Sequence, residues 1–201
     1  MNVTKDSQFV GQYILGIDPG LNITGYGVIE ICATGPKVRE AGVVRGRERG
    51  SIERRVKEIY QGVAEVIATF KPSSMAIEQL YSHYDRPRTA ILMGHARGVI
   101  CLAAAMADVR LEHYASTQVK KILTGNGRAP KDQMQLAVQR ELNLLVPPDP
   151  PDVADALAVA LCHYYLGVRA NANIGRGTGS KNKIGIEIGD DADIEAEMDE
   201  A

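Results

Sequence analysis

With 201 residues, 45% of them hydrophobic, the chain is long enough for one compact domain and too apolar for a wholly disordered protein. Its three cysteines are far apart and form no CxxC pair, which argues against both a disulfide framework and a zinc site. The net charge is −2, but the charge is unevenly distributed, because residues 187–201 contain eight acidic and no basic residues. The rest of the chain has 23 basic and 17 acidic residues. This balance is compatible with a polyanionic partner.

The N-terminal residues 1–10 include Lys5 and Asp6 and lack the apolar core of a signal peptide. We find no stretch that approaches the length of a membrane span. These features predict a cytoplasmic protein whose cysteines are reduced.

Three strands joined by turns are predicted next. An apolar run over residues 12–18 ends at the turn signal Asp18-Pro19-Gly20. A second run covers residues 23–31, and a third covers residues 37–45 after Thr34-Gly35-Pro36. Short turns between consecutive strands favour antiparallel hairpins.

The remainder of the domain alternates helices and strands. Ser51 is a predicted N-cap for a helix that reaches about Phe70, because apolar residues recur there at helical spacing. The elements expected after it are strand 74–80, helix 87–107, strand 109–113, short helices from Ser116 and Pro130, and a last helix that follows the proline-rich segment 147–151 and ends near Gly167. This order predicts a mixed α/β sheet of five strands with helices on both faces.

The composition changes near the C-terminus. Residues 171–183 are rich in Gly and Asn and suit a linker into the acidic end. We therefore expect a folded domain over residues 12–168, with residues 169–201 forming a disordered linker and acidic tail.

Four acids stand where an apolar element ends, is interrupted or begins. Asp18 ends the first strand, which also suits a turn-forming Asp before Pro-Gly. Glu78 interrupts an apolar strand, which also suits a solvent-facing position. Asp152 and Asp155 lie three apart in the first turns of the last helix, so both point to one side, although both also suit the positive end of the helix dipole.

Together, these four acids could converge at one edge of the sheet. Clustered carboxylates raise one another's pKa values, so such a cluster is costly unless cations neutralise it. Hard oxygen ligands suit Mg²⁺ or Mn²⁺ rather than zinc. Two ions about 3.5–4 Å apart could activate a water on one side of a phosphate and stabilise the leaving oxygen on the other, so the pattern favours phosphodiester hydrolysis.

Six motifs follow one another along residues 12–166. They are Ile14-Leu-Gly-Ile-Asp-Pro-Gly20, Thr24-Gly-Tyr-Gly-Val28, Ala76-Ile-Glu-Gln79, Ala96-Arg-Gly98, Gln118-Val-Lys120 and Asp152-Val-Ala-Asp-Ala-Leu-Ala158. This ordered set resembles the RuvC-type Holliday-junction resolvases, which are crossover junction endodeoxyribonucleases. The DxxDALA motif at the start of a late helix makes the resemblance highly specific.

The resemblance implies an RNase H-like fold and a homodimer that makes two symmetric, metal-dependent nicks in four-way DNA junctions during homologous recombination and repair. It implies that Asp18, Glu78, Asp152 and Asp155 hold the catalytic Mg²⁺, which Mn²⁺ could replace, with two ions per active site. It also implies a branch-migration motor complex as a partner.

Candidate DNA-binding residues surround Gly125-Asn126-Gly127. They form a basic cluster of Lys120, Lys121, Arg128 and Lys131. Such a cluster suits binding to a phosphate backbone, and a solvated helix end is the alternative interpretation. The resemblance implies that Lys120 and Lys131 lie near the scissile phosphate. It also implies that Tyr81 stacks on an unpaired base, with ordinary packing as the alternative.

The sequence departs from the family pattern in residues 81–89, which include His83 and are one residue longer than expected, and at His95, where Gln is expected. A cleavage-sequence preference therefore does not follow from the resemblance. Gly94 and Gly98 permit close approach of another helix, either in a dimer interface or in the core.

Three other functions remain open. The segment Asp18-Pro-Gly…Thr24-Gly also resembles the phosphate-binding hairpin of actin-like ATPases, but the chain is short and has no second phosphate loop or Walker motif. A junction-binding protein without catalysis is the second alternative. The third is a nuclease of the same fold that acts on RNA or RNA–DNA hybrids.

Overall fold

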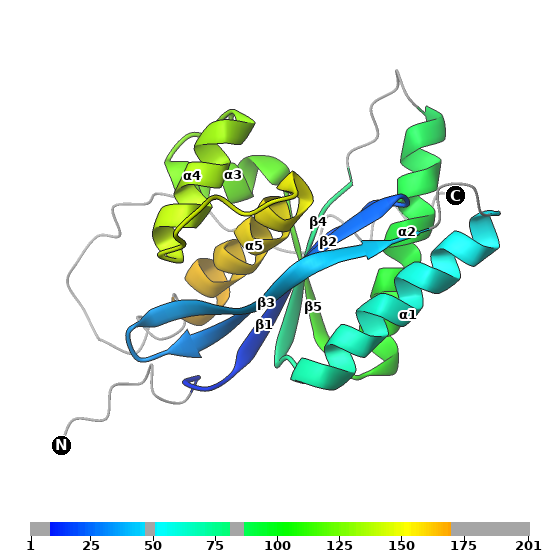
Figure 1. Ribbon diagram of the computed structural model, residues 1–201, viewed down its shortest axis with the longest axis horizontal. Coiled ribbons are helices and arrows are strands. Elements are labelled where there is room, and N and C mark those ends of the chain that lie inside the picture. Colours follow the sequence, from blue (N-terminus) through cyan, green and yellow to red (C-terminus); the bar gives the residue numbers. More distant parts are fainter. Residues whose placement is uncertain (1–8, 47–50, 81–86, 170–201) are drawn as a thin grey trace, which may run out of the picture.

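The computed structural model describes residues 9–46, 51–80 and 87–169, which form a five-stranded sheet with helices on both faces (Figure 1). The sheet order is β3-β2-β1-β4-β5. β2 pairs with β1 and with β3, and both pairs are antiparallel. β4 pairs in parallel with β1, and β5 pairs in parallel with β4. The strands are β1 (Tyr13–Asp18), β2 (Ile23–Cys32), β3 (Gly35–Arg45), β4 (Ser74–Glu78) and β5 (Arg110–Tyr114).

The helices also follow the predicted order. They are α1 (Ile52–Phe70), α2 (Pro87–Met106), α3 (Ser116–Thr124), α4 (Lys131–Glu141) and α5 (Pro151–His163), and a π-helical turn, η2 (Tyr164–Arg169), continues α5. The predicted mixed sheet with helices on both faces is therefore confirmed. Ser51 is the backbone N-cap of α1, but its hydroxyl donates to Glu53 rather than capping the helix.

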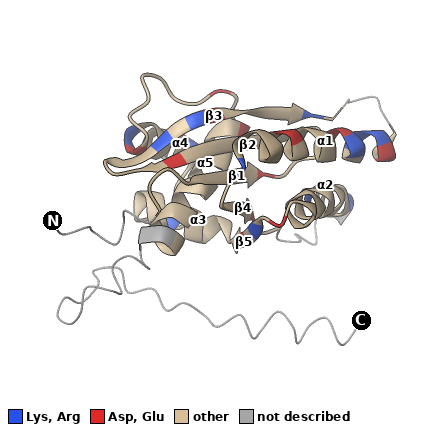
Figure 2. Cartoon of the chain, turned by 90° about the horizontal axis from the view of Figure 1, so that it is seen from below, with Lys and Arg blue, Asp and Glu red and all other residues tan. Residues whose placement is uncertain are grey.

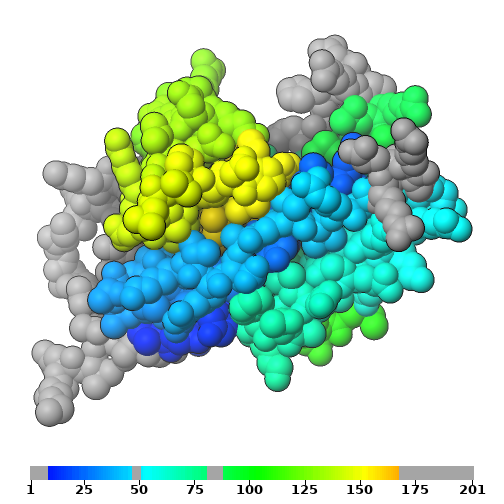
Figure 3. All heavy atoms as spheres, viewed as in Figure 1, coloured from blue at the N-terminus to red at the C-terminus, as the bar shows by residue number. Residues whose placement is uncertain are grey.

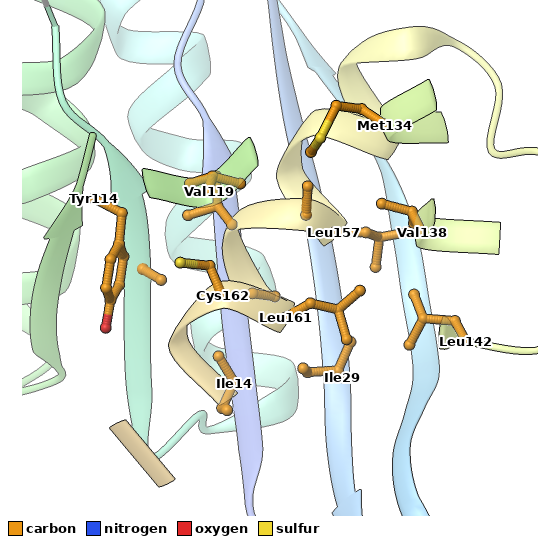
Figure 4. Packing of buried hydrophobic residues seen from close by; sticks show 14 of the residues in the cluster. Ile14, Ile29, Tyr114, Val119, Met134, Val138, Leu142, Leu157, Leu161 and Cys162 are labelled. Atoms are coloured by element: carbon orange, nitrogen blue, oxygen red, sulfur yellow. The ribbon is translucent and has the colours of Figure 1, made fainter. Parts of the chain in front are cut away.

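Side chains alternate across the strands and build two cores on opposite faces of the sheet (Figures 1 and 2). Leu15, Ile17 and Met75 pack with α1 and α2 on one face. Ile14 and Ile29 pack with α3, α4 and α5 on the other (Figure 4). Ten of the 13 residues of α5 are buried, so this helix is the centre of the second core.

The backbone of β1 and β2 lies directly against α5. A Cβ atom built on Gly16 would lie 2.2 Å from the carbonyl oxygen of Ala156, and one on Gly25 would lie 2.1 Å from that of Asp152. On Gly27 it would lie 2.5 Å from the Leu157 side chain. Any side chain larger than hydrogen would push the helix away, so the glycines allow α5 to lie close to the end of β1.

The sequence analysis found no stretch that approaches the length of a membrane span, and α2 shows that this is wrong by length and composition. Within the described part of the chain, Arg88–Met106 is a 19-residue stretch of mean hydropathy 1.5, long and apolar enough by length and composition to cross a membrane. His95 and Arg97 interrupt the stretch, which is why its apolar character is not obvious in the sequence. Its apolar surface is also poorly covered, since Leu102 is 51% and Met106 69% exposed.

His163 joins the end of α5 to two strands. Its Nε2 lies 2.9 Å from the Ser74 hydroxyl, and its Nδ1 lies 2.7 Å from the Tyr114 hydroxyl. Burial lowers the pKa of His163 below its ordinary value of 6.5, so the ring is neutral and one nitrogen donates while the other accepts.

This buried histidine should make the free energy of unfolding depend on pH. Below about pH 6.5 the unfolded chain takes up a proton at His163 that the native state resists, so stability should fall as the pH falls. Urea unfolding of His163→Gln should show a drop between pH 7 and pH 5 that is smaller than in the wild type by about 1 kcal/mol. The exposed His95, changed to Gln, is the control; equal pH dependence in both variants would contradict the assignment.

Candidate active site

Two of the predicted acids lie side by side at the carboxyl ends of neighbouring strands. Ile17 of β1 pairs in parallel with Ile77 of β4, and Asp18 and Glu78 are the next residues on each strand. Asp18 lies four residues after Ile14, and Glu78 lies two residues after Ala76. Because side chains alternate along a strand, both acids face the same side of the sheet as Ile14 and Ala76, which belong to the core around α5. Their side chains therefore point to the α5 face of the sheet.

The other two acids come from the first turns of α5. Asp18 pairs with Gly25 of β2, and Gly25 in turn touches the backbone of Asp152. This contact sets the N-terminus of α5 over the end of β1. Asp155 follows three residues later on the same side of the helix. Three elements distant in sequence thus bring the four carboxylates together.

The electrostatics of Asp18 reflect this convergence. Burial raises the pKa of Asp18, and the negative charges of Asp155, Glu78 and Asp152 raise it further, to about 8. Burial also raises the pKa of Glu78, with a contribution from Asp155. The cluster therefore holds more negative charge than it can stabilise alone, and an added cation would relieve it.

A lysine supplies part of the missing positive charge. The Nζ of Lys131, at the start of α4, lies 3.1 Å from Oδ2 of Asp155. Partial burial opposes the charged form of Lys131, but the hydrogen bond and charge of Asp155, with the charges of Asp152 and Asp18, raise its pKa. Among the described residues, no group of three or more His, Cys, Asp or Glu side chains is arranged so that it could hold a metal ion. The carboxylates are near enough to raise the pKa of Asp18, and Lys131 pairs with one of them.

The remaining basic residues lie around the α3–α4 turn. Lys120 is close enough to Glu78 to lower its pKa, against the larger effect of burial. Lys121 and Arg128 are exposed. The turn is held by hydrogen bonds: Thr124 Oγ1 donates to the Lys120 carbonyl at 2.8 Å, and the Arg128 amide donates to Asn126 Oδ1 at 3.0 Å. The four basic residues therefore range from direct contact with the acids to the open surface.

Tyr81, the predicted stacking residue, and His83 lie outside the described residues. The interpretation of Tyr81 therefore stays a prediction.

Two residues near the acids were given no role in the sequence analysis. The buried Thr24 donates from Oγ1 to the Gly20 carbonyl at 2.7 Å, which ties the turn after Asp18 to β2. Ser116, the first residue of α3, hydrogen-bonds the Glu78 carboxylate and lowers its pKa. A hydroxyl-bearing residue shortly after a turn or a strand is the signal that could have indicated both, but it is common in loops of every kind.

Comparisons with known proteins agree with this geometry. The family model described as "Crossover junction endodeoxyribonuclease RuvC" matches residues 14–163. A protein of that name from Rhodopirellula baltica is 61% identical over 155 residues, covering 76% of this chain and 86% of the relative. Another, from Desulforamulus reducens, is 44% identical and covers 75% of this chain and 91% of the relative.

Solved structures show the same fold. The structure of T. thermophilus RuvC in complex with Holliday junction substrate has a TM-score of 0.74 at 32% identity and covers 79% of this chain and 96% of that one. The yeast mitochondrial Holliday junction resolvase Ydc2 has a TM-score of 0.58 at 11% identity, a likeness of fold alone, and covers 84% of this chain and 85% of that one. The expected RNase H-like fold is confirmed.

Proposed function

The chain belongs to the RuvC family of crossover junction endodeoxyribonucleases, and we propose that it cleaves DNA at the cluster of Asp18, Glu78, Asp152 and Asp155. It is a Holliday-junction resolvase of DNA recombination and repair. One observation carries the assignment of the site: β1, β4 and α5 bury Asp18 beside three other carboxylates, and burial together with their negative charges raises the pKa of Asp18 to about 8.

The four carboxylates fit a divalent cation, and we propose Mg²⁺, replaceable by Mn²⁺, with two ions per active site. All the donors are hard oxygens, and a cation would offset the repulsion that raises the pKa values of Asp18 and Glu78. When bound, the ions would neutralise the carboxylates and stabilise the negative charge that develops on the phosphodiester.

The basic residues then position the DNA. The Lys131 side chain is 60% exposed, so its ammonium can turn from Asp155 to a phosphate oxygen that approaches the site. Lys120 lies beside Glu78 and extends the positive charge along α3. The exposed Lys121 and Arg128 would bind the backbone farther from the cut, and Tyr81 would stack on an unpaired base.

A homodimer would supply the second active site that paired nicks require, and we propose that α2 forms the interface. Its apolar surface is uncovered at Ile91, Leu102 and Met106, which are 63%, 51% and 69% exposed. A Cβ atom built on Gly94 or Gly98 would meet no atom of the described parts of the chain within 4 Å. A second apolar helix can therefore approach this face closely, as helices do at small residues.

The dimer should weaken when a charge is placed on this face. Leu102→Asp is expected to raise the dimer dissociation constant about 100-fold, because an unpaired carboxylate would be buried. Sedimentation velocity over a concentration series measures this. Leu136→Asp on α4, where the leucine is 47% exposed, is the matched control. If both variants dimerise as the wild type does, α2 is not the interface.

By family resemblance, the dimer would act in the cytoplasm beside a branch-migration motor complex.

Cleavage of an end-labelled four-way junction tests the proposed function. In Mg²⁺ we expect paired nicks on opposite strands of the junction and none in a linear duplex of the same sequence. Removing the metal with EDTA should slow cleavage at least about 1000-fold, and added Mg²⁺ should restore it. Tight junction binding without nicks in Mg²⁺ or Mn²⁺ would instead indicate a binding protein. Equal cleavage of an RNA–DNA hybrid would indicate a different substrate.

A further inference from the structure

A cavity of about 390 Å³ lies between the β2–β3 hairpin and the C-terminal end of α4. Residues 34–38 form one wall and residues 141–144 the other. Because β2 runs from the carboxylates at Ile23 to this hairpin at Cys32, the cavity is at the opposite end of the sheet from the active site. Figure 3 shows the hairpin in blue beneath α4 in yellow-green.

The cavity has one wall that hydrogen bonds hold in place, and its lining includes aliphatic side chains beside polar ones. Gln139 Nε2 donates to the carbonyl oxygens of Leu144 at 3.2 Å and of Leu145 at 3.4 Å, which holds the chain after α4 in place. Val38 and Leu144 line the cavity, and next to it Leu145 is 98% exposed. Uncovered aliphatic side chains at the mouth of a hollow favour an apolar occupant.

The same cavity borders a free sheet edge. β3 is the outermost strand of the sheet order, and its first residues, Gly35 to Val38, belong to the cavity wall. An edge strand offers backbone donors and acceptors to an added extended segment. The exposed Lys37 places a positive charge there.

The C-terminal part of the chain begins beside this cavity. The Tyr165 hydroxyl donates to the carboxylate of Glu141, a wall residue, so η2 contacts the wall of the cavity at this point. The described residues end four positions later, at Arg169. The 13 residues from 170 to 182 can span up to about 45 Å, so residues 183–188 can reach the cavity easily.

Residues 184–188 have the sequence Ile-Gly-Ile-Glu-Ile. Isoleucine at every second position is the pattern of a strand with one apolar face. Glu187 lies on the other face and could pair with Lys37. The rest of the tail after this segment is acidic and contains no second such alternation.

We propose that residues 184–188 occupy this cavity in the same chain, extended along the free edge of β3. A tether of this length gives an effective concentration on the order of millimolar, so a weak contact is enough to populate the docked state. Docking would keep the acidic residues after position 188 at the end of the sheet opposite the active site, away from the phosphate-binding face. This inference is independent of the proposed function.

Hydrogen exchange of the full-length protein tests the docking. The amides of residues 184–188 are expected to exchange about tenfold more slowly than their intrinsic rates, and residues 175–179 at those rates. Ile186→Asp should abolish the protection, whereas Ile174→Asp, the same change in the same tail, should leave it. Lys37→Glu should reduce the protection, and adding Glu187→Lys should restore it. Intrinsic exchange rates for residues 184–188 in the wild type would overturn the proposal.

A photo-crosslinking amino acid at position 186 gives a second, positional test. Crosslinks to residues 34–38 or 141–146 of the same chain are expected. Mixing ¹⁵N-labelled with unlabelled protein distinguishes the same chain from a neighbour. Mixed-isotope crosslinks, or crosslinks confined to other surfaces, would overturn docking within one chain.

Discussion

Replacement of Asp18 by Asn is expected to slow junction cleavage at least about 1000-fold while junction binding stays intact or becomes tighter. The side chain lies between β4 and the N-terminus of α5, where burial and the charges of three other carboxylates raise its pKa to about 8. If Asp18 is a cation ligand as proposed, the substitution removes that ligand and slows the chemistry. It would also remove a negative charge from the side that the phosphate approaches, which favours binding.

The same substitution should stabilise the metal-free protein. Because the native pKa of Asp18 is raised from 3.8 to about 8, the native state binds this proton more tightly than the unfolded chain does. The contribution of Asp18 to the free energy of unfolding is therefore fully present below pH 3.8 and is lost progressively as the pH rises toward 8. At pH 8 in EDTA, Asp18→Asn should raise the free energy of unfolding by about 2–4 kcal/mol, as measured by urea denaturation.

A matched control removes an acid elsewhere. Asp108 precedes β5 in a left-handed conformation (φ 53°) that Asn adopts as readily. Asp108→Asn should leave both cleavage and the free energy of unfolding at pH 8 unchanged. Full cleavage activity in Asp18→Asn would defeat the assignment of the carboxylate cluster as the active site.

Gly25→Ala is expected to reduce cleavage about 100-fold and to destabilise the protein by about 3 kcal/mol. The added methyl group would lie 2.1 Å from the carbonyl oxygen of Asp152, an atom of the helix backbone that cannot rotate away. The N-terminus of α5 must then move from β1, which separates Asp152 from Asp18. Cleavage rates and thermal unfolding, measured on the same preparation, check both parts.

Gly42→Ala on β3 separates this effect from a general loss of glycine in the sheet. Its methyl group would approach the Tyr26 side chain at 2.9 Å, and that side chain can move. We expect near wild-type cleavage and stability for this variant. If Gly25→Ala were as active as Gly42→Ala, the close packing of α5 on β2 would not position the active site.

The sequence predicts the fold well where local signals are strong. The three hairpin strands and α1 lie within two residues of their predicted bounds, because turn residues and apolar periodicity mark them clearly. The end of α5 differs: the helix stops at His163 and continues as a π-helical turn to Arg169. Tertiary contacts such as Tyr165 with Glu141 accompany that change, and local propensity carries no trace of them.

The four acids were predicted from their positions and from the family motifs, and their roles as metal ligands stay predictions. What the sequence does not contain is the distance between them. The contact of Gly25 with Asp152 joins residues 127 positions apart, and no local feature of the sequence marks it. The ion pair of Lys131 with Asp155 likewise depends on how α4 packs beside α5.

The contact between α5 and the first two strands has a consequence for how this sequence can vary. Gly16 lies against the carbonyl oxygen of Ala156 and the methyl group of Ala160, so a larger side chain at Gly16 or at Ala160 would require a compensating change. Related sequences should therefore preserve small residues at these positions together, as a correlated set. A Cβ atom on Gly94 or Gly98 of α2 would meet no atom of the described residues within 4 Å, so if α2 is the dimer interface as proposed, a restriction on side-chain size there would come from the second molecule. The pattern of tolerated substitutions in a deep mutational library would then map internal and intermolecular contacts separately.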